Sequence, residues 1–147
     1  MKPTLLTISA ACLFDPAGRL LLVRKRNTRA FMLPGGKAEP GEDALTALTR
    51  ELAEELNLDL APEALSPIGQ FHAQAANEAN TWINASVFRA RLPHPVSAAA
   101  ELEELHWLAA GDTPPNELAP LLRDHLLALL WPDNIKLRRA SGSVTSR

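Results

Sequence analysis

The chain has 147 residues, the length of a single domain with one hydrophobic core. Hydrophobic residues make up 46% of it and charged residues 22%, as in ordinary globular proteins, and the formal net charge is −2. This balance argues against a general nucleic-acid or membrane-surface binder, so any chemistry on polyanions has to come from a local cluster of residues and metal ions.

The cysteine content and the first residues indicate the compartment. The single cysteine, Cys12, excludes an intramolecular disulfide and a thiolate metal cluster, and its apolar surroundings favour a buried inert thiol. The first residues contain no signal-peptide core, and no apolar run approaches the roughly 20 residues of a membrane span. We therefore expect a cytoplasmic protein.

The N-terminal part is predicted to form strands. Residues 5–14 are apolar, and the turn signal Asp-Pro-Ala-Gly at 15–18 separates them from a second apolar run at 19–24, which predicts a hairpin. Residues 26–29 form a polar loop. Residues 31–33 are predicted to form a short strand that stops at Pro34-Gly35-Gly36.

The period of the apolar residues changes over residues 42–56, which we predict to be a helix. Its leucines recur at helical spacing on one face, at Leu45, Leu48, Leu52 and Leu56. The preceding Pro-Gly-Glu-Asp at 40–43 supplies a helix breaker and then acids that complement the positive end of the helix dipole.

The second half of the chain continues with strands and a helix. Residues 68–73 and 82–91 are predicted to be strands around a turn at 77–80, and residues 106–108 a further short strand. Residues 118–131 are predicted to be an amphipathic helix. Residues 138–147 are polar and lack apolar anchors, so we expect a disordered tail behind one α/β domain that spans residues 1–137.

Three carboxylates share one side of the helix predicted at 42–56. Glu51, Glu54 and Glu55 are spaced i, i+3 and i+4, about a quarter to a third of a turn from the leucine stripe. Such crowded charges cost stability unless they are neutralised, and Mg²⁺ is typically bound by carboxylates together with substrate phosphates. A solvated acidic helix face is the alternative explanation of the same pattern.

A longer pattern surrounds these glutamates. Gly36 is followed after five residues by Glu42, and after seven more by the run Arg-Glu-Leu-Ala-Glu-Glu-Leu-Asn-Leu at 50–58. This resembles the Nudix box, Gly-x5-Glu-x7-Arg-Glu-U-x-Glu-Glu-x-Gly-U, in which U is a bulky apolar residue. Asn57 stands where the family has glycine. Asparagine is the next most tolerated residue in a left-handed helix C-cap, so we interpret it as a conservative exception.

By this motif the chain is identified as a member of the Nudix hydrolase superfamily, in its MutT-like branch. The resemblance implies the Nudix fold, an α/β/α sandwich with a mixed central sheet and a loop–helix–loop box. It also implies Mg²⁺ as the cofactor, with Mn²⁺ as a substitute. The metal ligands carried over are Glu51, Glu54, Glu55 and the backbone carbonyl of Gly35.

The resemblance also assigns supporting roles within the box. Arg50 would orient Glu51 through an ion pair, and Gly36 and Glu42 would brace the loop–helix–loop. Arg50, Glu51 and Glu54 are the expected catalytic residues. Glu51 is the candidate general base, although family members differ in which residue serves as the base.

A further acid is expected near the metal from outside the box. MutT-like enzymes often carry an acid ahead of a tryptophan that approaches the metal or the nucleophilic water, and residues 101–104 (Glu-Leu-Glu-Glu) precede Trp107. Glu101 is the first choice for this metal ligand and Glu104 the second. A surface run of acids is the alternative.

Substrate-binding residues are expected from two segments. Arg24, Lys25 and Arg26 leave the second strand toward the glycine loop, and Arg24 and Arg26 are our candidates for phosphate contacts; a solvated strand end is the alternative. Asn116 lies in a segment resembling the one that offers an asparagine to the purine in MutT-type 8-oxoguanine nucleotide hydrolases. An N-cap for the following helix is the alternative.

The resemblance implies Mg²⁺-dependent hydrolysis of the pyrophosphate linkage of a nucleoside-diphosphate derivative. The short chain and the loop before the box favour a (d)NTP or an oxidised purine NTP, which would give NMP and pyrophosphate. Dinucleotides, nucleotide sugars and RNA 5′ ends are alternatives, as is a non-catalytic nucleotide-binding regulator, which the retained carboxylates disfavour. The expected partner is a small-molecule nucleotide, with no membrane or general nucleic-acid binding, and a homodimer stays open.

Overall fold

The computed structural model describes residues 2–132, so the expected domain boundary at 137 and the expected tail at 138–147 lie outside the described residues. The strands are β1 (Thr4–Phe14), β2 (Leu20–Lys25), β3 (Gly35–Lys37), β4 (Ser66–Gln74), β5 (Thr81–Arg91) and β6 (Leu102–Leu108). The helical elements are α1 (Ala44–Leu56), the 3-10 turn η1 (Pro62–Ala64), the π-helical turn η2 (Leu122–Leu126) and α2 (Leu127–Leu130). None of these described helices is long and apolar enough to span a membrane.

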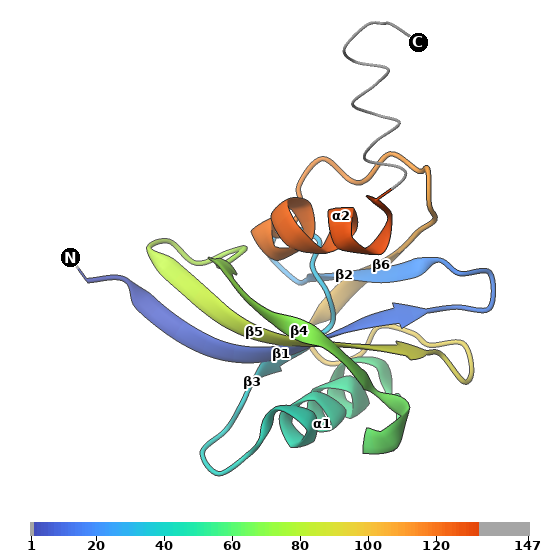
Figure 1. Ribbon diagram of the computed structural model, residues 1–147, viewed down its shortest axis with the longest axis horizontal. Coiled ribbons are helices and arrows are strands. Elements are labelled where there is room, and N and C mark those ends of the chain that lie inside the picture. Colours follow the sequence, from blue (N-terminus) through green and yellow to red (C-terminus); the bar gives the residue numbers. More distant parts are fainter. Residues whose placement is uncertain (1, 133–147) are drawn as a thin grey trace, which may run out of the picture.

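The core of the fold is one mixed sheet in the order β4-β5-β1-β2-β6, with β3 paired to β1. β1 runs parallel to β5 along its whole length and antiparallel to β2, which confirms the predicted hairpin. α1 covers one face of the sheet, and the segment containing η2 and α2 covers the other (Figure 1). The α/β/α sandwich with a mixed central sheet is therefore confirmed.

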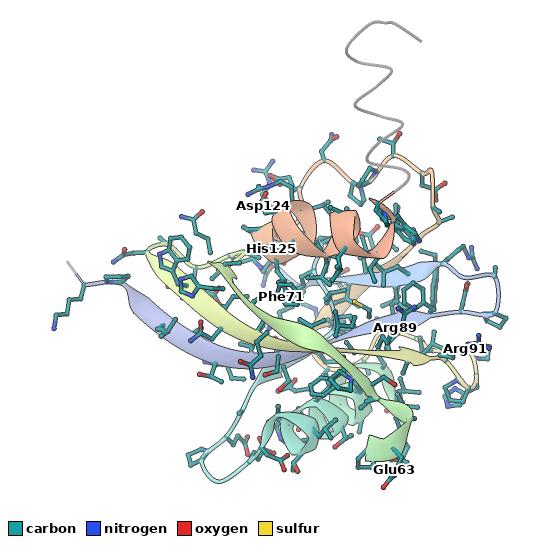
Figure 2. All side chains as sticks on the ribbon, viewed as in Figure 1. Glu63, Phe71, Arg89, Arg91, Asp124 and His125 are labelled. Atoms are coloured by element: carbon teal, nitrogen blue, oxygen red, sulfur yellow. The ribbon has the colours of Figure 1, made fainter. Side chains whose placement is uncertain are left out.

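Each face of the sheet has its own hydrophobic core, and β2 contributes residues to both. Leu21 and Val23 pack with the leucines of α1, whereas Leu20 and Leu22 pack with residues of the η2 segment on the other face. Beside the second core, the ring centroids of Phe71 on β4 and His125 on η2 lie 5.7 Å apart, so η2 also contacts β4 (Figure 2).

The box helix matches its prediction closely. α1 begins at Ala44, two residues later than expected, because the Asp43 carboxylate caps it by accepting the backbone N–H of Thr46 at 2.8 Å. At the other end Asn57 adopts the left-handed conformation, with φ of 52°, and its N–H donates to the carbonyl of Ala53. The asparagine thus takes the backbone role expected of the family's glycine.

The prediction of a strand at 31–33 is wrong. Phe31 and Met32 form only isolated bridges, and regular pairing occurs instead in β3, which includes the two glycines expected to end the strand. The reason lies in the sheet itself. A Cβ on Gly35 would collide with the carbonyl oxygen of Ser9 on β1, so β3 can approach β1 only where a side chain is lacking.

Two C-terminal boundaries also differ from prediction. The helical segment begins at Pro120, two residues later than expected. The reason is that Leu118 forms an isolated β-bridge with Phe31 and is therefore extended. β6 begins at Leu102, four residues earlier than expected. Its acidic start is stabilised by ion pairs to the end of β2, at 3.1 Å for Arg24–Glu104 and 3.4 Å for Arg26–Glu103.

Candidate active site

Glu55 is the most buried acidic side chain among the described residues, with 3% of its surface exposed. It lies on α1 facing β3, where its Oε1 accepts the backbone N–H of Gly35 at 3.1 Å. Burial raises the pKa of the Glu55 carboxyl to about 8; the Gly35 hydrogen bond opposes this shift, while the charges of Glu51 and Glu101 add to it. A group placed in this way binds either a proton or a cation near neutral pH.

Glu51 lies one turn earlier on α1, against the second glycine of β3. A Cβ on Gly36 would lie 2.5 Å from the carboxyl carbon of Glu51, so a side chain at this position would displace the Glu51 carboxylate. Burial raises the pKa of Glu51, and the hydrogen bond from Arg50 opposes that rise. The site therefore contains two partly desolvated carboxylates side by side.

Arg50 connects the loop before α1 to the helix. Its guanidinium donates to both Glu42 oxygens, at 2.7 and 2.8 Å, and to Glu51 at 3.1 Å. The hydrogen bonds from Arg50 lower the pKa of Glu42 to about 2. A further hydrogen bond to the carbonyl of Lys37, at 3.1 Å, joins the end of β3 to the same group. These contacts are those expected of an orienting arginine and a bracing glutamate.

Glu54 does not converge with the other two carboxylates. Its side chain is 54% exposed and is paired with Arg50 at 3.5 Å. Within residues 2–132, no three His, Cys, Asp or Glu side chains are arranged so that they could hold a metal ion. The donor chemistry nevertheless fits a divalent cation, because Glu51 and Glu55 lie one turn apart on α1 and burial disfavours the charged form of each. The charge of Glu54 adds to this effect at Glu51, and the charges of Glu51 and Glu101 add to it at Glu55. Glu54 could join them only by leaving Arg50.

The basic residues at the end of β2 divide between the two sides of the strand. Lys25 lines the cleft beside Glu51 and Gly35, and its positive charge opposes the burial-driven rise in the pKa values of Glu51 and Glu55. Arg24 is held by Glu104 and by the carbonyl of Thr28 at 2.8 Å, and it does not line the cleft.

Arg26 is likewise engaged outside the cleft. It donates to Glu103 and, at 3.3 Å, to the carbonyl of Ala100. Lys25 is thus the residue of this triplet that reaches the site, although Arg24 and Arg26 were the ones expected. Strand alternation could have identified it, because Lys25 shares its side of β2 with the core residues Leu21 and Val23.

The two acids considered ahead of Trp107 also separate. Glu101 lines the cleft and pairs with Lys25 at 3.5 Å, and its backbone carbonyl accepts the N–H of Arg26 at 2.8 Å. Glu104 is paired with Arg24 away from the cleft. The structure therefore brings Glu101, and not Glu104, close to the carboxylates of α1.

The cleft has a volume of about 550 Å³ and a chemically mixed lining. Its charged lining residues are Lys25, Lys37, Glu39, Glu51, Glu78 and Glu101, beside the two glycines. Its aliphatic lining includes Leu6, Ile8, Leu33, Ile83 and Leu121. Charged and aliphatic groups in one cleft suit a molecule that joins an anionic group to an uncharged ring.

Asn116 is not brought to this cleft. It is exposed in the loop after β6 and is absent from the cleft lining. It is also not an N-cap, because the helical segment begins four residues later. The structure thus supports neither explanation of this residue, and its role in base recognition stays a prediction.

The chain is similar to known proteins both in sequence and in fold. A family model described as "NUDIX domain" matches residues 4–130. A MutT NUDIX hydrolase structure from Burkholderia pseudomallei is 25% identical, with a TM-score of 0.65, and the match covers 78% of this chain and 90% of that one. A MutT protein from Methanosarcina mazei Go1 is 23% identical, with a TM-score of 0.62 and coverages of 75% and 80%. No curated protein sequence matches the chain.

A third structure is larger than this chain. It is a bifunctional NMN adenylyltransferase/ADP ribose pyrophosphatase from Francisella tularensis, complexed with AMP and a manganese ion. It is 22% identical with a TM-score of 0.65, and the match covers 88% of this chain and 42% of that one. The chain thus spans less than half of this bifunctional protein, and the likeness shows a shared fold.

The raised pKa of Glu55 predicts how stability depends on pH. In the unfolded chain this carboxyl titrates near 4.5 and in the folded protein near 8, so the native state retains a proton that the unfolded state has lost. We therefore expect the free energy of unfolding of metal-free protein to fall between these two pH values. The Glu55→Gln variant, which keeps an acceptor for Gly35, should not show this fall.

Urea unfolding of both proteins at several pH values measures the difference. Subtracting the variant from the wild type removes the contributions of other carboxyls, such as Glu42, whose lowered pKa acts in the opposite direction. Parallel stability curves for the two proteins would show that Glu55 is not a proton-binding group in the fold.

Proposed function

The chain belongs to the NUDIX domain family and is a Nudix pyrophosphohydrolase. We propose that it uses a divalent cation to cleave the pyrophosphate linkage of a nucleoside-diphosphate derivative. The observation that carries the proposal is the buried Glu55 carboxylate, which accepts the N–H of Gly35 beside a cleft lined by Gly35, Glu51 and Lys25. The charged groups suit a pyrophosphate and its cation, and the aliphatic residues that line the same cleft suit a nucleoside.

The cation would be held by the carboxylates of α1 and the glycine strand. Glu51, Glu55 and the carbonyl of Gly35 are the proposed ligands, with Glu54 added once it leaves Arg50 and Glu101 approaching from the loop before β6. Oxygen ligands of this kind favour Mg²⁺, and Mn²⁺ can take its place. When bound, the cation supplies charge neutralisation and activation of water.

The chain's own residues divide the remaining work. Lys25 is proposed to bind a phosphate oxygen, since it lines the cleft, as Lys37 does, and its charge acts on both Glu51 and Glu55. Glu51 is proposed as the general base, because Arg50 fixes its carboxylate at the cleft and burial raises its pKa, which makes it a stronger base than an exposed carboxylate. The aliphatic walls would hold the nucleoside by excluding water from its apolar faces.

The proposed substrate class is a small nucleotide, and the cytoplasm, which is the compartment expected from the sequence, supplies such molecules. The sequence favours a nucleoside triphosphate because the chain is short and because of the loop before the box. Neither feature shows which residues contact the part of the substrate beyond its second phosphate. The name of the Francisella neighbour includes an ADP-ribose pyrophosphatase, which keeps nucleotide sugars within the proposed class.

Replacing the carboxylates tests the proposed cation site. We expect Glu55→Gln and Glu54→Gln each to reduce kcat/KM at least about 100-fold, because each removes a charged ligand, and EDTA should abolish activity in the wild type. The assay is hydrolysis of nucleoside triphosphates, nucleotide sugars and dinucleotides in Mg²⁺ and Mn²⁺.

The matched control is Glu63→Gln, since Glu63 is an exposed glutamate on η1 at the far side of α1 (Figure 2). This control should retain wild-type activity. Full metal-dependent turnover by both the Glu54 and the Glu55 variants would refute the assignment.

A second pair of variants tests which basic residue binds phosphate. We expect Lys25→Met to lower kcat/KM by about 10- to 100-fold, the cost of losing a charged contact to phosphate. Arg24→Met should change it less than about threefold, because Arg24 forms a partly exposed ion pair outside the cleft. Steady-state kinetics on the best substrate give both values, and the reverse order of losses would contradict the assignment of Lys25.

A further inference from the structure

A π-helical turn interrupts the helical segment that covers the second face of the sheet. At η2 the N–H of Leu127 donates to the carbonyl of Leu122, five residues earlier. On the N-terminal side of the turn the Arg123 N–H donates to the carbonyl of Ala119, four residues earlier, at 3.0 Å. On the C-terminal side the Trp131 N–H donates to the carbonyl of Leu127, again over four residues and at 3.0 Å. The turn therefore contains one residue more than a turn of α-helix.

The spacing of apolar residues in this segment favours the extra residue. The side chains that pack in the second core come in adjacent pairs, at 121–122, 126–127 and 130–131. Three exposed residues separate the first two pairs, and two exposed residues separate the last two. Pairs five residues apart share one face of a π turn, whereas pairs four residues apart share one face of an α-helix. Leu129, which would share the face of Leu122 in an uninterrupted α-helix, is accordingly 53% exposed.

The first apolar pair is the part of the segment that reaches the catalytic cleft. Leu121 and Leu122 both line the cleft, although Leu121 is only 4% exposed and Leu122 is 0% exposed. Ile8 and Leu33 line the same cleft and pack in the same core as these leucines. We call Leu121 and Leu122 the leucine wall. It is a firmly packed side of the cleft and not an open surface.

The two ends of the segment are held by different parts of the fold. The chain before the π turn is tied to the loop before β3, where the Ala119 N–H donates to the carbonyl of Phe31 at 2.8 Å. The other end is anchored on the sheet by the fully buried Leu126 and by the contact of His125 with Phe71 (Figure 2). The extra residue lets both anchors be satisfied at once. Its removal would draw the leucine wall along the helix axis by about 1.5 Å, the rise of one helical residue.

We propose that the π turn determines specificity, because it sets the position of the leucine wall against which the nucleoside of the substrate packs. This rests on the proposed function, which places a nucleoside among the aliphatic residues of the cleft, and it names the residues that select it. The position of the wall decides how much apolar surface of the nucleoside is removed from water. The phosphates and the cation are held elsewhere, at Lys25 and the carboxylates of α1. The turn therefore acts on binding of the nucleoside and not on the chemical step.

Deletion of one exposed residue removes the π turn. Asp124 is exposed, is paired with its neighbour Arg123 at 2.8 Å, and is absent from the cleft lining. Its deletion leaves two residues between the first and second apolar pairs. Every pair is then four residues from the next, so one α-helix can seat all three on the sheet. The matched control is Asp124→Ala, which removes the same carboxylate but keeps the number of residues.

Two ligands that differ in the nucleoside separate its binding from that of the phosphates. They are the best nucleotide of the hydrolysis screen, measured by its KM, and inorganic tripolyphosphate, measured by its Ki as a competitive inhibitor. We expect deletion of Asp124 to raise the ratio of KM to Ki about tenfold, a usual effect of altering an apolar pocket, while kcat changes less than about threefold. Asp124→Ala should change the ratio less than about twofold, because it removes an exposed ion pair.

A second variant, Leu121→Ala, keeps the π turn and removes part of the wall, and it should also raise the ratio about tenfold. The specificity role is refuted, while the pyrophosphohydrolase assignment stands, if the ratio rises less than about threefold in either variant. It is also refuted if the deletion abolishes the cooperative urea transition, since the turn is then a requirement of the fold. If no nucleotide is cleaved with Mg²⁺ or Mn²⁺, the function proposed for the cleft fails separately. The Kd values of ATP and tripolyphosphate from calorimetry in Mn²⁺ then replace KM and Ki, and the same rise is required.

Discussion

The burial of one carboxylate, that of Glu55 between α1 and β3, determines how the rest of the cleft is built. Removing a carboxylate from water is costly unless hydrogen bonds or opposite charges compensate. The Gly35 N–H and the charge of Lys25 supply part of that compensation, while Glu51 and Glu101 add negative charge and oppose it. The fold therefore leaves a deficit of positive charge beside the cleft, where Glu55 contacts Gly35. A proton meets this deficit in the metal-free protein, and a divalent cation bound with the substrate's phosphates would meet it during turnover.

The close approach of β3 to both β1 and α1 makes this burial geometrically feasible. Gly35 lies where any side chain would collide with β1, and Gly36 where one would collide with the Glu51 carboxylate. Arg50 then fixes the loop between β3 and α1 by joining Glu42 to Glu51. Gly35 allows β3 to approach β1, Gly36 leaves room for the Glu51 carboxylate, and Arg50 joins the loop to the helix, so the carboxylates are positioned by contacts beyond their own side chains.

Features encoded locally could be predicted from the sequence, and features created by long-range contacts could not. The 44–56 helix and the first hairpin follow from residue period and turn residues, and the box follows from the spacing of its own residues. Alternation along β2 puts Lys25 on the same side as Leu21 and Val23, but which side of β2 faces α1 depends on pairing with β1 and β6. Asn116 was expected beside the base from its neighbours in sequence, but its loop is placed by the bridge between Phe31 and Leu118. The turns at 27–30 and 76–79 line one hollow although they are about fifty residues apart, and no local pattern in either turn indicates this.

Counting the protons released on metal binding tests the role of Glu55 most directly. Calorimetric titration of Mn²⁺ into metal-free protein near pH 7, in two buffers with different ionisation enthalpies, gives this number. Because the pKa of Glu55 is raised to about 8, wild-type protein should release about one proton per ion bound, and Glu55→Gln should release almost none. Binding of the ion without proton release by the wild type, or equal release by the variant, would contradict the view that this buried carboxylate exchanges its proton for the cation.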